Sequence, residues 1–184
     1  GNDTLHADSN GSTNQTSADI LYGGAGNDTL YGNAGDNTLD GGTGADTIIS
    51  YGGSDMIVLR SGDGGSTQSE GDTVTDFTEG TDSLGLDSLN FGDLTIEQSG
   101  SDTVIKEGSS YLVTLTGISA SNVTVLDFQS TDTSNQTFTG TSGNDTLIGG
   151  AGGDTFNGGA GSDTLLGWGG SDTFNIRSKT GSYK

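Results

Sequence analysis

The feature that most constrains this chain is a nine-residue repeat. Residues 23–49 read GGAGNDTLYGNAGDNTLDGGTGADTII, which is three nonapeptides of the form G-G-x-G-x-D-x-U-x, with U a large apolar residue. Self-similarity at a fixed short period is typical of stacked repeats, in which each unit buries its apolar residue against its neighbours. In-register copies form two arrays, at 23–31, 32–40, 41–49 and 50–58, and at 140–148, 149–157, 158–166 and 167–175.

The two arrays indicate an internal duplication. Asp28 corresponds to Asp145 and Asp46 to Asp163, at one constant offset. The likeness continues beyond the repeats, because IVLRSGDG at 57–64 parallels FNIRSKTG at 174–181. We therefore expect one unit, a repeat array followed by a flanking module, to occur twice, with the second module incomplete.

The segment between the arrays has a different pattern. Runs such as TVTDF, DTVIK and YLVTLTGI alternate with turn residues, which predicts several short strands joined by hairpin-type turns and no helix. We expect the following parts in chain order: a first repeat array at 1–58, a β-rich capping or spacer module at 59–139 with a polar linker at 130–137, a second array at 140–175, and the start of a truncated second cap at 176–184.

The charge of the chain favours cations as partners. Twenty-five acidic residues face five basic ones, for a net charge of −20. Such a surface repels nucleic-acid phosphates and anionic membranes, and no apolar run approaches the length that spans a membrane. Cysteine is absent, so the chain has no disulfide framework. The first residues, GNDTLH, match positions four to nine of the repeat, so we expect a longer parent chain.

The repeat itself predicts a need for metal. Each nonapeptide has a strand-like triplet after a glycine turn, so two of them make one coil and stacked coils make two facing parallel sheets. Only one apolar residue per repeat points inward: Leu30, Leu39, Ile48 and Ile57. Carboxylates two repeats apart share a side and repel one another. A hard divalent cation reverses that repulsion, and carboxylates with backbone carbonyls are the ligands that Ca²⁺ prefers.

These nonapeptides resemble the RTX, or hemolysin-type, calcium-binding repeat. The resemblance implies an all-β fold of two parallel β-rolls, a right-handed calcium-binding solenoid, with the β-rich module between them. It also implies several Ca²⁺ ions, each between repeat n and repeat n+2, held by both sixth-position side chains and by carbonyls of the two loops. The implied ligand sets are Gly24, Gly26, Asp28, Gly41, Thr43 and Asp46; Thr141, Gly143, Asp145, Gly158, Ala160 and Asp163; and Gly150, Gly152, Asp154, Gly167, Gly169 and Asp172.

One sixth position departs from the pattern. Asn37 would be shared by an Asp19/Asn37 site and an Asn37/Asp55 site, each with one carboxylate and one amide oxygen. We expect both sites to be weaker and still occupied; an empty pair and simple relief of charge crowding are the alternatives. Asp36 should point outward and not compensate.

The module after the first array also resembles one that follows RTX arrays in secreted bacterial proteins. That likeness rests on GDTVTDFTEGTDSLGL and the strand-like runs after it. It implies a cap on the open sheet edge at the end of the roll. Asp63 or Asp72 could then complete a terminal calcium site.

No catalytic signature is present in the sequence. With His6 as the only histidine, no Ser-His-Asp arrangement is persuasive, and the common hydrolase, nucleotide-binding and zinc motifs are missing. We expect a non-catalytic, monomeric calcium-binding module of a larger secreted bacterial protein, exported unfolded by type I secretion. The alternative is a polysaccharide-recognition module of an adhesin or polysaccharide-acting enzyme, because FNIRSKTGSYK at 174–184 resembles alginate epimerase accessory modules.

Overall fold

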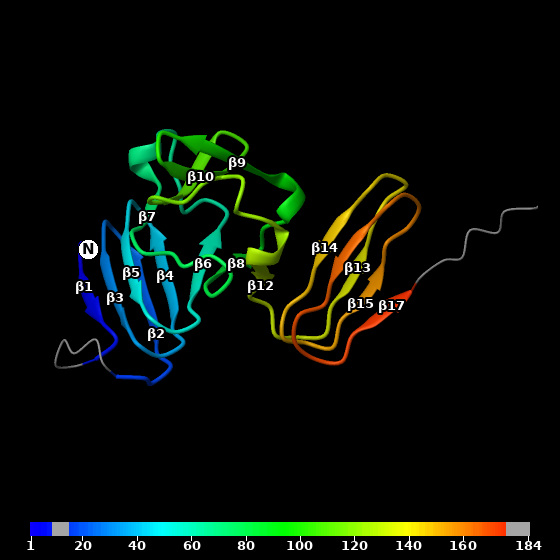
Figure 1. The fold of residues 1–184 in the computed structure, drawn as a ribbon, viewed down its shortest axis with the longest axis horizontal. Helices are drawn as coiled ribbons and strands as arrows, with labels where there is room; N and C mark the ends of the chain where they lie inside the picture. Colours follow the sequence, from blue (N-terminus) through cyan, green and yellow to red (C-terminus); the bar gives the residue numbers. More distant parts are fainter. Residues whose placement is uncertain (9–14, 176–184) are drawn as a thin grey trace, which may run out of the picture. The chain divides into compact units, whose positions relative to one another are not determined.

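The regular structure of this chain consists mainly of short β-strands joined by turns. The computed structural model describes residues 1–8 and 15–175, and within these ranges it has no α-helix (Figure 1). Backbone contacts divide the chain into two units, residues 1–89 with 93–129 and residues 90–92 with 130–184. The expected start of a second cap at 176–184 lies outside the described residues.

Alternate strands of the first unit build two largely parallel sheets, as one coil per two nonapeptides requires. The seven-stranded sheet has the order β1 (Thr4–His6), β3 (Thr29–Asn33), β5 (Thr47–Tyr51), β7 (Asp72–Val74), β11 (Ser110–Leu115), β10 (Asp102–Glu107) and β9 (Leu94–Ser99). The five-stranded sheet has the order β12 (Phe128–Ser130), β8 (Ser83–Asp87), β6 (Met56–Arg60), β4 (Thr38–Thr43) and β2 (Ile20–Ala25).

The eighth position of each repeat points into the roll. In one sheet Leu30 pairs with Ile48 and Ile48 with Val74. In the other sheet the corresponding row is Leu39, Ile57 and Leu84. All six side chains are completely buried. Stacking therefore turns one apolar residue per repeat into a continuous core, although that core is only one side chain wide in each sheet.

Both sheets continue beyond residue 58, where the sequence analysis placed the end of the first array. Strand β7 pairs with β5 and β8 pairs with β6, both in parallel. Next, β11 runs parallel to β7, and β10 and β9 follow it as antiparallel strands, while β12 lies beside β8. The edges of the last coil are thus covered by paired strands, which is what a capping module supplies. Three 3-10 helices join these strands: η1 (Gln68–Glu70), η2 (Phe91–Asp93) and η3 (Val125–Asp127).

The second unit is a smaller roll. Strands β13 (Thr137–Thr139), β15 (Thr155–Asn157) and β17 (Thr173–Asn175) form one parallel sheet, and β14 (Thr146–Ile148) and β16 (Thr164–Leu166) form another. The eighth positions of the three-stranded sheet are phenylalanines, and the ring centroids of neighbours lie 5.0 and 5.1 Å apart. Two parallel β-rolls in an all-β chain confirm the expected fold class.

Residues 131–139 differ from the loose linker that their polar composition suggested. They form a degenerate nonapeptide whose eighth residue, Phe138, pairs with Phe156. Their sixth residue, Gln136, donates its backbone N–H to Oδ1 of Asp154 at 2.8 Å. Because these bonds use the backbone, nine residues without any glycine can still form half a coil on a neighbour that has the full pattern.

Candidate metal centres

The sixth-position side chains form continuous rows along the first roll. Each residue precedes or begins a strand, and, after the first residue of each row, its Oδ1 accepts the backbone N–H of the sixth-position residue one coil earlier. Asp46 Oδ1 accepts from Asp28 at 2.7 Å, and Asp55 Oδ1 accepts from Asn37 at 2.8 Å. The first row, leading into the seven-stranded sheet, is Asp3, Asp28, Asp46 and Asp72; the second row, leading into the five-stranded sheet, is Asp19, Asn37, Asp55 and Asp82.

The other carboxylate oxygen is left without a partner in three of these residues. Oδ2 of Asp28, Asp46 and Asp55 is buried and accepts no hydrogen bond, and each residue is at most 2 % exposed. A buried carboxylate oxygen without a hydrogen bond or counter-ion is strongly destabilising. The rows therefore have the chemistry of cation ligands.

The first-position glycines show where these oxygens point. A Cβ atom on Gly23 would lie 2.5 Å from the carbonyl oxygen of Gly41 and 2.8 Å from Oδ2 of Asp28. Gly41 and Asp28 both belong to one predicted ligand set, so a side-chain-free position lets two predicted ligands converge. Gly140 has the same relation to the Gly158 carbonyl and to Asp145 Oδ2 in the second roll. Carboxylate and carbonyl oxygens around a cleared space fit a hard cation such as Ca²⁺.

Hydrogen bonds join the two loops of each predicted ligand set. Gly26 N donates to Thr43 O at 2.9 Å, and Gly169 N donates to Gly150 O at 2.9 Å. Ala160 N donates to Thr141 O at 3.1 Å in the remaining set. In the second roll, Oδ2 of two sixth-position aspartates already accepts a hydrogen bond: Thr141 N donates to Asp145 Oδ2, and Gly150 N donates to Asp154 Oδ2.

Side chains alone do not complete any of these centres. Among residues 1–8 and 15–175, no group of three or more His, Cys, Asp or Glu residues lies close enough to hold a metal ion. The individual ligand assignments remain predictions.

Two residues beyond the repeats continue the rows. Asp72 Oδ1 accepts from Asp46 N at 3.0 Å, and Asp82 Oδ1 accepts from Asp55 N at 3.1 Å. Asp72 was one of two residues expected at a terminal site, whereas Asp82 was not foreseen. The sequence does contain a signal, because Asp72-Thr73-Val74 and Asp82-Ser83-Leu84 both repeat the D-x-U triplet, although the G-G-x-G run of the repeat does not precede it.

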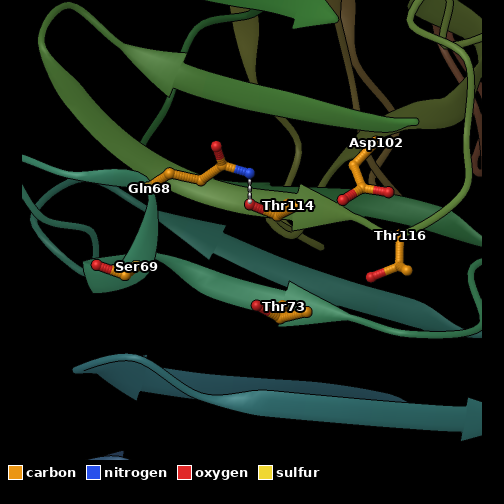
Figure 2. Close-up of a pocket in the computed structure, with 6 residues that line it drawn as sticks. All are labelled: Gln68, Ser69, Thr73, Asp102, Thr114 and Thr116. Atoms are coloured by element: carbon orange, nitrogen blue, oxygen red, sulfur yellow. Dashed lines mark hydrogen bonds between the residues drawn. The ribbon is translucent and has the colours of Figure 1, made fainter. Parts of the chain in front are cut away.

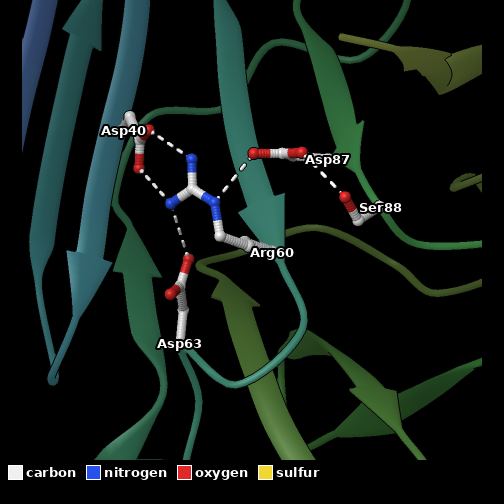
Figure 3. A network of polar contacts seen from close by, with 5 residues as sticks. All are labelled: Asp40, Arg60, Asp63, Asp87 and Ser88. Carbon is white, nitrogen blue, oxygen red and sulfur yellow. Dashed lines mark hydrogen bonds and ion pairs between the residues drawn. The ribbon is translucent and has the colours of Figure 1, made fainter. Parts of the chain in front are cut away.

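Asp63, the other residue expected at a terminal site, is bound by an arginine. Figure 3 shows Arg60 of β6 between three carboxylates: its Nη2 donates to Asp40 at 2.8 Å, its Nε to Asp87 at 2.8 Å and its Nη1 to Asp63 at 3.4 Å. Asp40 lies in β4 and Asp87 in β8, so one guanidinium links three neighbouring strands. The roll thus contains a guanidinium cation near its candidate metal centres. The sequence analysis did not foresee this role of Arg60.

The rows hold carboxyls that resist ionisation in the absence of metal. Burial raises the pKa of Asp55 to about 6, with Asp82 adding to the effect. Burial also raises the pKa of Asp63 to about 6 against the opposing effect of Arg60. The pKa of Asp46 is raised by burial and by the nearby charge of Asp28, in spite of the N–H bond from Asp28. A bound divalent cation would favour the ionised forms.

A shallow polar pocket lies elsewhere in the first unit. Figure 2 shows its lining on β7, β10, β11 and η1: Gln68, Ser69, Thr73, Asp102, Thr114 and Thr116. Its volume is about 520 Å³. The N–H of Gly117, with help from the Ser101 hydroxyl, lowers the pKa of Asp102. The lining offers hydroxyl, amide and carboxylate groups for hydrogen bonds.

None of the described helices is both long and apolar enough to cross a membrane.

Comparison with known proteins identifies the repeats. A family model described as the RTX calcium-binding nonapeptide repeat matches residues 15–48, 31–65 and 139–174. No curated protein matches the chain in sequence.

Two solved structures resemble the fold. The extracellular lipase LipA of Serratia marcescens aligns at 29 % identity and a TM-score of 0.53 over 69 % of this chain and 19 % of the lipase. The AlgE6R2 subunit of the Azotobacter vinelandii mannuronan C5-epimerase aligns at 27 % identity and a TM-score of 0.50 over 69 % of this chain and 86 % of the subunit. The chain therefore spans less than a fifth of the lipase and most of the epimerase subunit.

Proposed function

Because the repeats of this chain belong to the RTX calcium-binding nonapeptide family, we propose that it is a non-catalytic module that binds several Ca²⁺ ions and folds when it does so. The observation that carries this proposal is the set of unpartnered, buried Oδ2 atoms on Asp28, Asp46 and Asp55. Each belongs to a row in which carboxylates stack one coil apart. Ca²⁺ between coils would give these oxygens a partner and remove the repulsion.

The thin core makes folding depend on the metal. Each nonapeptide orders nine backbone units and buries only one large apolar side chain, so burial of apolar surface alone does not offset the loss of conformational entropy. Calcium at a hundred times Kd adds about 2.7 kcal/mol per site. Several sites acting together stabilise the folded state enough to decide whether the rolls form.

This metal dependence suits a protein that is exported unfolded. Free calcium is scarce inside cells and abundant outside, so the rolls would remain unfolded before export and fold afterwards. The structural likeness to an extracellular lipase supports a secreted or cell-surface location. The share of the lipase that aligns, 19 %, also supports a module within a larger parent chain.

Circular dichroism of the full chain in EGTA and in millimolar CaCl₂ tests the proposal. We expect the β-sheet signal to appear only with calcium, with MgCl₂ as the matched control that leaves the chain largely unfolded. Magnesium demands a stricter octahedron and sheds water reluctantly. An unchanged β-sheet spectrum after chelation would overturn the proposal.

Polysaccharide recognition is a second candidate, supported by the likeness to an epimerase subunit and by the polar pocket of Figure 2. The net charge of −20 favours a neutral glycan over an acidic one. Retardation in affinity gels that contain neutral or acidic polysaccharides tests it. A Thr73→Trp change should abolish retardation by filling the pocket, and migration unaffected by every glycan would contradict this candidate.

A further inference from the structure

The second repeat of the first array departs from the pattern at two positions at once. Residues 32–40 read GNAGDNTLD, with Asn33 where the other repeats favour glycine and Asn37 where they have aspartate. The structure buries both side chains: Asn33 is fully inaccessible and Asn37 is 2 % exposed. Two buried amides in a single repeat need hydrogen-bond partners, and those partners are oxygens expected to bind calcium.

Asn37 directs its NH₂ group into the space of the Asn37/Asp55 site. Its Nδ2 donates to the Gly35 carbonyl at 2.6 Å and lies 3.1 Å from Oδ1 of Asp55. Gly35 occupies the fourth position, whose carbonyl is a ligand in the other predicted sets. A Cβ on Gly32 would face Asn37 Nδ2, as a Cβ on Gly23 would face a carboxylate oxygen. The NH₂ group of Asn37 therefore occupies the place of the carboxylate oxygen that has no hydrogen-bond partner in Asp28, Asp46 and Asp55.

Asn33 places its NH₂ group in the preceding site, the Asp19/Asn37 site. Its Nδ2 donates to Oδ2 of Asp19 at 2.8 Å, and its Oδ1 accepts from Gly35 N at 2.6 Å. Asp19 Oδ2 is the counterpart of the unpartnered oxygens of Asp28, Asp46 and Asp55, yet here it has a hydrogen-bond donor. Together with the Ser17 hydroxyl, which donates to the same oxygen at 2.8 Å, the amide of Asn33 therefore supplies the partner that a cation would supply to Asp28, Asp46 and Asp55.

We propose that the amides of Asn33 and Asn37 take the place of two calcium ions, so that the Asp19/Asn37 and Asn37/Asp55 sites hold no metal. This inference rests on the proposed calcium-binding function and revises the expectation of two weak, occupied sites. A cation here would meet N–H hydrogens in place of lone pairs. The first roll then depends on metal in its first row, while the Asn37 region of its second row is held by hydrogen bonds that need no metal.

Calcium stoichiometry of the full chain tests this. The double change Asn33→Gly with Asn37→Asp restores the full repeat, and we expect it to bind two more calcium ions than the unchanged chain in native mass spectrometry and titration calorimetry. Asn27→Asp is the matched control: it makes the same chemical change at an exposed fifth position and should leave the number of ions unaltered.

The outcomes separate the two proposals. If the unchanged chain binds no calcium, the proposed function fails. If it binds calcium and the double variant binds the same number, only the present inference fails.

A second measurement does not depend on the variant folding. In the calcium-loaded, unchanged chain, the Asn37 side-chain NH₂ should exchange slowly with solvent by NMR, because it donates to Gly35 and Asp55. Fast exchange of that NH₂ in the folded protein would overturn the inference.

Discussion

Each sixth-position aspartate uses its two oxygens differently. Oδ1 accepts a backbone N–H from the coil before it, as Asp46 does from Asp28. Oδ2 points to the space beside the first-position glycine, where Asp28 Oδ2 and the Gly41 carbonyl converge. In Asp28, Asp46 and Asp55 one oxygen therefore aligns the coils, and the other has no hydrogen-bond partner and is available to a cation. Asparagine keeps the first of these roles, since Asn37 Oδ1 still accepts from Asp19 N, but it brings a donor in place of the second oxygen.

The first-position glycine can be tested with a single methyl group. In Gly23→Ala the new Cβ would lie 2.5 Å from Gly41 O and 2.8 Å from Asp28 Oδ2, so these oxygens must move apart. Overpacking of this kind destabilises by about 1–3 kcal/mol. We expect calcium affinity at the Asp28/Asp46 site to fall about tenfold or more, measured by calorimetry.

The matched control is Gly52→Ala. Its Cβ would meet nothing closer than 4.0 Å, and alanine already occupies this third position in several repeats. It should bind calcium like the unchanged chain. Equal affinities for Gly23→Ala and Gly52→Ala would show that the glycine does not shape the site.

At the scale of strands, the first roll is held by two kinds of cross-strand link. The inward rows of apolar residues stack within each sheet, as Leu39 does on Ile57. On the five-stranded sheet, Arg60 joins β4, β6 and β8 through Asp40 and Asp87 (Figure 3). Since Asp40 is only 5 % exposed, it depends on this guanidinium for a counter-ion. The guanidinium remains when calcium is removed, so this link is independent of metal.

Arg60→Met keeps an unbranched side chain and removes the guanidinium with its charge and hydrogen-bond donors. We expect the free energy of unfolding in saturating calcium to fall by about 2–3 kcal/mol, because Asp40 and Asp63 are left buried without a partner. Urea denaturation measures it. Lys106→Met, which breaks the ion pair with the half-exposed Glu97, is the control, and its free energy of unfolding should fall by much less than that of Arg60→Met. Similar losses in the two variants would contradict a special role for Arg60.

For the whole molecule, the acidic rows link folding to both calcium and protons. Folding raises the pKa of Asp55 from 3.8 to about 6, so the metal-free folded state holds a proton that the unfolded state releases near pH 4. This contribution to stability is fully present below about pH 4 and is lost as the pH rises through about 6. Protons and calcium therefore compete for the same carboxylates while each favours the folded chain.

The sign of the pH dependence is thus opposite with and without metal. In EGTA we expect β-sheet signal to increase as the pH is lowered from 7 to 4, because protonation removes the repulsion in the rows. In the calcium-loaded chain, affinity at the Asp28/Asp46 site should fall as the pH is lowered, because a proton must leave Asp46, whose pKa is raised by burial. Circular dichroism and calcium titration at several pH values measure the two effects. A metal-free chain that loses structure on acidification would contradict this account.

The sequence by itself determined the repeat, its inward residue and the all-β roll. Each nonapeptide carries its own glycine turn and strand triplet, and their period alone brings residues such as Leu30 and Ile48 into register. The choice of calcium-type ligands also follows from local chemistry. These features are local to nine residues and recur in every copy, so they could be read without a structure.

Only the tertiary structure decided how partners from distant coils share each oxygen. It placed Asp72 and Asp82 in the rows although the G-G-x-G run of the repeat does not precede them, and it made half a coil of the polar stretch 131–139. It also showed the Asn37 amide donating to Gly35 and Asp55. The reason is that the hydrogen-bond partner of a side-chain oxygen or amide lies 18 or more residues away. The orientation of that side chain depends on which residue the fold places beside it.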